Sequence, residues 1–257
     1  MRQDGLEGAL ASTQARVEAA QRESAAATRE LKKARAAAAV GQVRDLRRAL
    51  AAAVEAAQAL AAAAKEAEAS YTFDEGEHLA SGAYARELLD AASTAGLAVV
   101  EDDDRLLCYP SLVRVLPGDA ALDIDRRRER RLRPSVVVAS LAAAQARPPK
   151  GKPEALLESL VAAYELLAAR EERPDPVLRL YALSQVLTML PGAARDYSKP
   201  EFARDLYLLD QSGTVTSRSG RTLRFHASSG TRGAGVLTTV ARTGQQQRYW
   251  GVSFTAR

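Results

Sequence analysis

The chain has 257 residues, a formal net charge of +4 and one cysteine, Cys108. A single cysteine excludes an intramolecular disulfide and fits a reducing compartment. Two histidines and one cysteine support neither a zinc site nor catalysis by a thiol. No apolar run reaches the roughly 20 residues that span a bilayer, and Asp4 and Glu7 interrupt the stretch where a secretory signal would be apolar. We therefore expect a soluble cytoplasmic protein with no membrane contact and no cofactor. Arginine outnumbers lysine thirty to six, a usage typical of a bacterial gene.

The residue patterns predict an α+β fold, mainly α, in four parts. These are a helical coiled-coil arm (1–70), a wing-like α/β domain (71–147), a helical segment (148–210) and a basic antiparallel β module (211–257).

The N-terminal part predicts a long alanine-rich helical arm. From Leu6, small and apolar residues recur at alternating spacings of four and three, the heptad pattern of a coiled-coil seam, which includes Ala27 and Ala34. Gly41 interrupts the pattern. If the chain bends there, residues 5–40 and 42–69 form an antiparallel hairpin; if it continues, the rod approaches about 100 Å in length.

Such an arm needs a partner helix, from a second copy or from another protein. The aliphatic residues expected to bind this partner are Leu6, Leu10, Val17, Leu31, Val43, Leu46, Leu50 and Leu60. Eleven basic and nine acidic residues are mixed in the arm, which argues against nucleic-acid binding there. The alternative is a solvated alanine-rich helix without a partner.

Residues 81–109 predict a helix and a β-hairpin. Ser81 can cap the helix and Gly96 can end it, and two strands, 97–100 and 106–109, follow. This order ends a winged-helix unit, but Asp102, Asp103 and Asp104 at the hairpin tip would repel phosphates, so we favour a structural or protein-docking role. Neighbouring side chains of a strand face opposite sides, so the three aspartates predict no metal site.

Further strand-like residues, 112–116 and 122–124, lead to a cluster of arginines. Those expected to contact phosphate are Arg126, Arg127, Arg128, Arg130 and Arg131. Residues 71–133 contain thirteen acids against nine bases, so internal pairing of this cluster is an equal alternative. Pro134 ends the cluster, and a helix over 136–146 follows.

Residues 147–153 read as a proline-rich linker, and apolar residues then recur at helical spacing. The spacing predicts helices from 156 to about 173, over Val177–Leu190, and from Ser198, where Ser198 and Glu201 fit a capping box.

The last 47 residues contain seven arginines and neither aspartate nor glutamate, so this module has a formal charge of +7. Short runs, 214–217, 221–227, 236–242 and 247–255, predict one antiparallel sheet of three or four strands. We expect Leu223, Phe225 and Ala227 to point inward, Arg224 and His226 outward, and Trp250, Val252 and Phe254 to close the core. The residues expected to bind nucleic acid are Arg218, Arg221, Arg224, His226, Arg232, Arg242 and Arg248.

The loop 228–235 has the composition of a phosphate cradle, but Val236 and Leu237 stand where a P-loop requires lysine and a hydroxyl residue. Arg221, His226, Arg232 and Tyr249 could be arranged for phosphoryl transfer through a tyrosine nucleophile, but their spacing matches no arrangement of that kind, and no catalytic residue is predicted.

These patterns favour a non-enzymatic subunit of a bacterial nucleic-acid-handling complex that contacts phosphate backbones without sequence preference. By analogy with its architecture alone, the complex could serve genome maintenance or anti-phage defence. The alternative is an adaptor whose arginine surface docks on an acidic protein partner.

Overall fold

The protein is a mixed α+β structure in the computed structural model, which describes residues 5–190, 192, 197–227 and 235–255. By its contacts the chain divides into two units, one of residues 1–87 with 132–135 and the other of residues 88–131 with 136–257. Among the described residues, no helix is long and apolar enough to cross a membrane.

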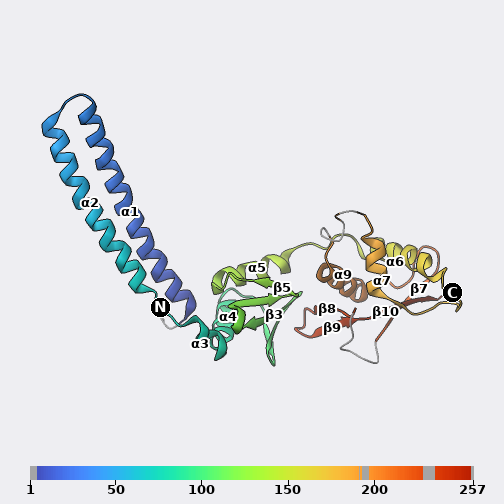
Figure 1. Ribbon diagram of the computed structural model, residues 1–257. Helices are drawn as coiled ribbons and strands as arrows, with labels where there is room; N and C mark the ends of the chain where they lie inside the picture. Colours follow the sequence, from blue (N-terminus) through green and yellow to red (C-terminus); the bar gives the residue numbers. More distant parts are fainter. Residues whose placement is uncertain (1–4, 191, 193–196, 228–234, 256–257) are drawn as a thin grey trace. The chain divides into compact units, whose positions relative to one another are not determined.

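The first unit begins with a pair of long antiparallel helices, α1 (Leu6–Ala39) and α2 (Val43–Ser70) (Figure 1). Gly41 makes the turn with a φ of 74°, a left-handed conformation that glycine adopts without a steric penalty. Of the two arrangements that the sequence allows, the chain therefore adopts the hairpin.

Alanine fills the space between the two helices. Apart from Leu6, the buried residues of the pair are Ala27, Ala34, Ala37, Ala49, Ala53 and Ala67. Small side chains let the helix axes approach closely, and two larger residues of the predicted seam on α1, Val17 and Leu31, are 43% and 56% exposed in the single chain. The larger aliphatic residues lie beside the seam.

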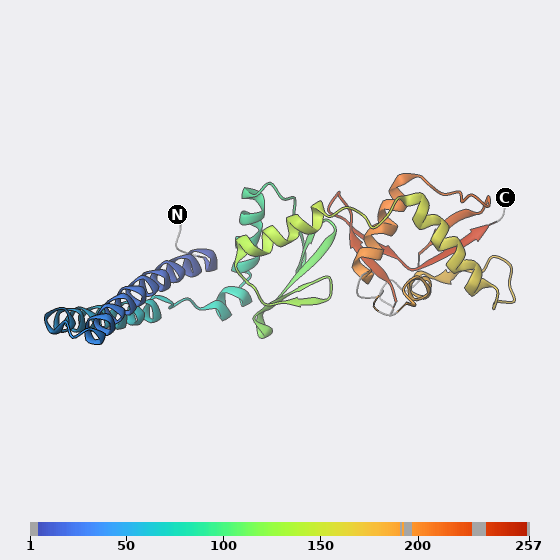
Figure 2. The same ribbon diagram turned by 90° about the horizontal axis from the view of Figure 1, so that it is seen from above.

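A short helix that the sequence did not predict, α3 (Glu75–Ala80), follows, and the predicted helix after it is α4 (Ala83–Thr94). In the second unit an antiparallel sheet has the order β1-β2-β3-β4-β5, and helix α5 (Pro134–Ala146) lies alongside it (Figure 2). The strands are β1 (Val100–Asp102), β2 (Arg105–Cys108), β3 (Ser111–Leu116), β4 (Ala121–Ile124) and β5 (Arg127–Glu129). The fifth strand comes from the arginine cluster and was not predicted as a strand.

The rest of the second unit combines helices with two small sheets. The helices are α6 (Pro153–Ala168), α7 (Leu180–Leu187) and α9 (Lys199–Ser212). The strands are β6 (Leu178–Arg179), β7 (Thr222–His226), β8 (Leu237–Val240), β9 (Gln246–Tyr249) and β10 (Gly251–Thr255). Leu160, Leu183, Phe202, Val252 and Phe254 are at most 1% exposed and belong to the core between helices and strands.

Two predicted elements are wrong in this region. The helix expected over Val177–Leu190 begins only at Leu180, because Leu178 and Arg179 pair with β10, and it ends at Leu187. The single strand expected over 247–255 is divided at Trp250 into β9 and β10, which belong to different sheets, β8-β9 and β6-β10-β7. Trp250 is half-buried, and Val252 and Phe254 close the core without it.

Helix α9 begins with the predicted capping box. Ser198 and Glu201 exchange hydrogen bonds there, so two N–H groups at the helix N-terminus have acceptors. On the next turn Arg204, 4% exposed, donates to the carbonyl oxygens of Arg147 and Pro148 at 3.2 Å and forms an ion pair with Asp205. The start of the proline-rich segment is thus held against α9.

Candidate nucleic-acid interface

The outer face of the three-stranded sheet gathers basic residues. In an antiparallel sheet, residues directly opposite one another share a face, and Arg179 of β6 and His226 of β7 both lie opposite Gly251 of β10. Arg224 lies opposite Ser253, two residues further along β10. Because the helices cover the other face (Figure 1), where Val252 and Phe254 are buried, Arg179 and Arg224 are exposed on this one.

Arg179 is the residue that sequence reasoning missed. The helical spacing of its neighbours predicts a helix over this residue, whereas the strand pairing puts it beside Arg224. No local signal marks this strand, because Pro174 and Pro176 restrict only the residues that precede them, and the pairing of Leu178 and Arg179 with β10 joins residues far apart in the sequence.

His226 faces this side, and its ring makes a hydrogen bond within the sheet. Its Nε2 lies 2.7 Å from the Oγ of Ser253, which is 5% exposed, and the ring is half-buried. The imidazole therefore contributes mainly a hydrogen bond between β7 and β10. Ala227, expected inward, is exposed at the end of the strand.

Arg221 is neutralised by acids from the preceding helical part. Its Nε lies 2.9 Å from Glu165 and its guanidinium 3.5 Å from Asp175. Arg218 is exposed, and its backbone N–H donates to Glu158 at 2.8 Å. Arg221 of the acid-free end therefore has its counter-charges in α6 and in the loop that follows it.

The two remaining arginines of this module within the described residues lie away from β7. Arg248 is on β9, in the other small sheet, with its guanidinium 2.6 Å from Gln246. Arg242 follows β8 and lies over the ring of Tyr109 at 5.5 Å. One continuous cationic sheet face was therefore a wrong prediction, because the chain changes sheets at Trp250. Arg232 and most of the glycine-rich loop lie outside the described residues.

The arginine cluster before α5 is partly paired. Arg128 lies 2.8 Å from Asp119, and Arg131 makes a two-point contact with Glu129. The Arg131 hydrogen bonds lower the pKa of Glu129 to about 2. Arg126, Arg127 and Arg130 are exposed, with no acid within ion-pair distance among the described residues.

Neighbouring strands extend this pattern of charge pairing. The strand register places Arg105, Arg114, Asp123 and Arg128 in one row across β2 to β5. Asp104, from the triple-aspartate turn, pairs with both Arg105 and Arg114. That turn is therefore part of an ion-pair network on the sheet.

The groups considered for catalysis have separate structural partners. The hydroxyl of Tyr249 donates to Asp210 at 2.9 Å, and burial, followed by the Asp210 charge, raises the pKa of Tyr249. Cys108 is fully buried, and burial, with the charge of Asp125, raises the pKa of its thiol to about 11. Neither group is exposed as a nucleophile, and the described residues contain no group of three or more potential metal ligands.

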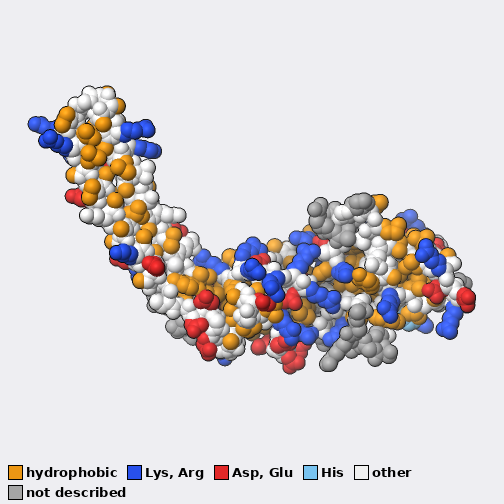
Figure 3. Space-filling model, viewed as in Figure 1, with side chains coloured by type: hydrophobic (Ala, Val, Ile, Leu, Met, Phe, Trp, Pro, Cys, Tyr) orange, Lys and Arg blue, Asp and Glu red, His pale blue; other side chains and the backbone are white. Residues whose placement is uncertain are grey.

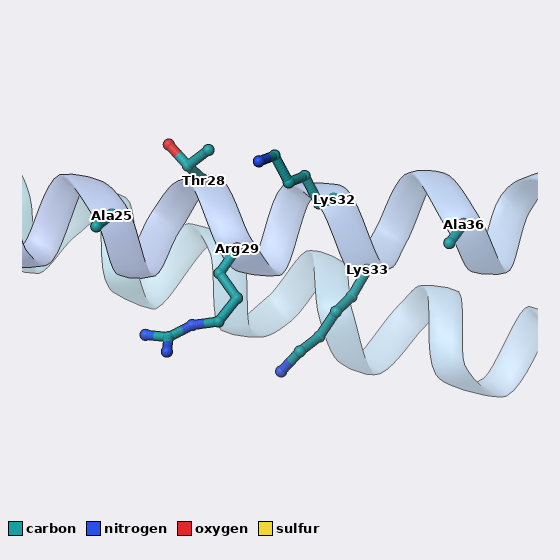
Figure 4. Close-up of a pocket in the computed structure, with 6 residues that line it drawn as sticks. All are labelled: Ala25, Thr28, Arg29, Lys32, Lys33 and Ala36. Atoms are coloured by element: carbon teal, nitrogen blue, oxygen red, sulfur yellow. The ribbon is translucent and has the colours of Figure 1, made fainter.

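The hairpin separates charges that looked mixed in the sequence. Residues 29–48 surround its tip and contain seven basic and two acidic side chains, a net charge of +5. Figure 3 shows lysine and arginine side chains at the edges near this tip, with hydrophobic side chains over both helices. Arg29 and Lys33 point to one side of α1 and Lys32 to the other, around a shallow groove (Figure 4).

Comparison with known proteins gives no relative: no protein-family model, curated protein or solved structure matches this chain.

Proposed function

We propose that the protein is a non-enzymatic cytoplasmic subunit that binds the phosphate backbone of nucleic acids, with the outer face of the β6-β10-β7 sheet as its contact surface. The N-terminal helices would associate with a protein, either a second copy or another subunit. The observation that carries the proposal is the pair of exposed arginines, Arg179 and Arg224, on the sheet face opposite the helices. Arginine binds phosphate oxygens through a planar fork of N–H donors.

Further exposed cations would extend the contact. Arg248 lies in the neighbouring sheet, Arg127 lies on β5 of the five-stranded sheet, and Arg126 and Arg130 lie just before and just after β5. Arg221 and Arg131 are expected to contribute little, since acids already hold their guanidinium groups.

Fluorescence anisotropy of the full chain with random-sequence duplex and single-stranded probes tests the proposal. We expect Arg179→Gln with Arg224→Gln to weaken binding at low salt at least tenfold, about 1.4 kcal/mol. The matched control is Arg170→Gln with Arg173→Gln, two exposed arginines of the same unit with the same loss of charge. Equal effects of the two pairs would show that only net charge matters and would sink the proposed site.

The second candidate is an adaptor that docks its arginine surface on an acidic protein. The observation that favours it is the hairpin, whose exposed aliphatic residues suit association with protein. If the wild-type chain binds neither probe at low salt, the adaptor replaces the nucleic-acid proposal.

A further inference from the structure

The hairpin carries a long face without charged residues. On α1 it consists of Leu10, Val17, Ser24, Leu31 and Ala38, and from α2 into its C-cap it consists of Val43, Leu50, Ala57, Ala64 and Tyr71. Seven-residue spacing keeps each series on one side of its helix. Val17, Ala64 and Tyr71 line one shallow groove, so the two series lie on the same side of the hairpin. We name these ten residues the heptad face.

The heptad face is exposed, apart from the half-buried Leu10, although it is largely aliphatic. Leu31 and Val43 are each 56% exposed, Leu50 46% and Val17 43%. The contact between α1 and α2 is already completed by alanines, so these side chains have no role in closing the hairpin. A contiguous apolar surface of this kind marks an interaction site.

We infer that the heptad face binds the same face of a second copy, with the tip of one hairpin over the base of the other, in a four-helix bundle. The inference rests on the proposed role of the N-terminal helices in protein association and is independent of nucleic-acid binding. A two-fold axis requires one surface that complements itself. An axis through Ser24 and Ala57 sets Val17 against Leu31 and Leu50 against Ala64 of the second copy.

The side-chain sizes suit this orientation. Ser24 and Ala57, at the centre, are small and permit close approach of the two layers. Away from the centre, large residues meet smaller ones in two pairs, Leu10 with Ala38 and Leu50 with Ala64. Alternation of large and small residues across facing positions is how packed helical layers interlock.

The charges beside the heptad face favour the same orientation. Arg47 and Glu68 border it on α2, near the tip and near the base. The tip-over-base arrangement brings Arg47 of one copy to Glu68 of the other. The opposite arrangement, tip over tip, would set Arg35 of one copy against Arg47 of the other, two like charges.

The available area is sufficient for a stable dimer. A helix of 28 residues is about 42 Å long at about 1.5 Å per residue, and two helices side by side are about 20 Å wide. Their common face covers about 800 Å² per copy, the size of a standard specific interface.

Disulfide trapping in the full chain tests the orientation. Cys108 is fully buried, so oxidation should join only introduced cysteines. We expect Ser24→Cys alone to give a covalent dimer, and a mixture of Val17→Cys and Leu31→Cys chains to give a mixed dimer. Trapping of Val17→Cys with Ala64→Cys chains would indicate the tip-over-tip arrangement and overturn the inferred one, as would no trapping of Ser24→Cys.

Sedimentation without nucleic acid tests the surface itself. We expect Leu31→Glu with Leu50→Glu to convert the dimer to a monomer of unchanged helicity, because both side chains are exposed in one copy. The control, Ala25→Glu with Gln58→Glu, places the same charges on exposed positions outside the heptad face and should remain dimeric. A monomeric wild type, or a dimeric Leu31→Glu/Leu50→Glu variant, would overturn the inference and leave the nucleic-acid proposal intact.

Discussion

Two glutamates cap helix N-termini far from them in the sequence. Glu87 accepts hydrogen bonds from the N–H groups of Leu6 and Glu7, both at 2.9 Å, and its carboxylate lies 2.7 Å from Nε2 of His78. Glu7 in turn accepts from the N–H of Ser135 at the start of α5 and from the Arg133 guanidinium. The first N–H groups of a helix lack acceptors within the helix. The Glu87 carboxylate supplies acceptors at the start of α1, and the Glu7 carboxylate supplies one at the start of α5.

Replacing Glu87 therefore tests the base of the hairpin. We expect Glu87→Ala to lower the free energy of unfolding by about 1–3 kcal/mol, because two helix N–H groups and His78 lose their acceptor. Asp90→Ala, which removes an exposed acid from the same helix, is the control and should change stability little. Denaturant unfolding followed by circular dichroism measures both; equal losses would contradict the capping role.

The protonation of Glu7 should make the stability of the protein depend on pH. Burial raises the pKa of Glu7, but the hydrogen bonds from Ser135 and Arg133 outweigh burial and lower it overall. A carboxylate with a lowered pKa in the folded state stabilises the fold above its unfolded pKa, and this stabilisation is lost as the pH falls through the folded value. We expect wild type to lose more stability than Glu7→Gln below about pH 4. Parallel pH profiles of the two melting temperatures would contradict this.

At the scale of elements, α9 organises the second unit through buried polar contacts. Arg204 joins Asp205 and the carbonyls of Arg147 and Pro148, Tyr197 donates to Asp205 at 3.0 Å, and Tyr249 donates to Asp210. These contacts tie α9 to the segment before α6 and to β9. A buried ion pair of this kind contributes mainly when both partners are present.

Removing one partner should therefore be costly. We expect Arg204→Ala to destabilise the second unit by about 3–5 kcal/mol, because Asp205 would remain buried without its cation. Arg204→Ala with Asp205→Ala should recover part of this loss. Thermal unfolding of the single and double variants checks it, and a double variant no more stable than Arg204→Ala would be the contrary result.

Local signals predicted some elements well. The capping box at Ser198 and the hairpin through the aspartates depend on neighbouring residues, and each is present, whereas Gly41 left a bend and a continuous rod open. Strand β6 depends on a partner far along the chain, since its two residues pair with β10, whereas β5, with two arginines among its three residues, pairs with the neighbouring strand β4. No local pattern marks such short strands, and Arg179 was missed for this reason.

The sequence predicted that the candidate surface is rich in arginine, but it did not predict which arginines lie side by side. The excess of arginine at the C-terminal end was visible, but which arginines are neutralised depends on Glu165 and Asp175, which come from other elements. In the same way, the heptad spacing was visible, but the alanines that fill the hairpin could be separated from the exposed aliphatic residues only by seeing both helices together.

For the whole molecule, the distribution of charge matters more than its sum. The net charge of +4 hides a hairpin tip of +5 and a C-terminal stretch of +7, in which Arg221 pairs with Glu165 of α6 and with Asp175. Backbone binding by a few exposed arginines should be weak per site and sensitive to salt. A dimer through the heptad face would present two such surfaces and raise the apparent affinity for long probes over short ones.

The salt dependence of binding to duplex DNA tests the central claim most directly. For each phosphate contact removed, the slope of the logarithm of the binding constant against the logarithm of salt concentration should become shallower by about 0.9. We expect Arg179→Gln with Arg224→Gln to reduce the slope by about 1.8 relative to wild type, and Arg170→Gln with Arg173→Gln to leave it unchanged. An identical slope for wild type and the Arg179/Arg224 variant would contradict the proposed contact of the β6-β10-β7 face with phosphate.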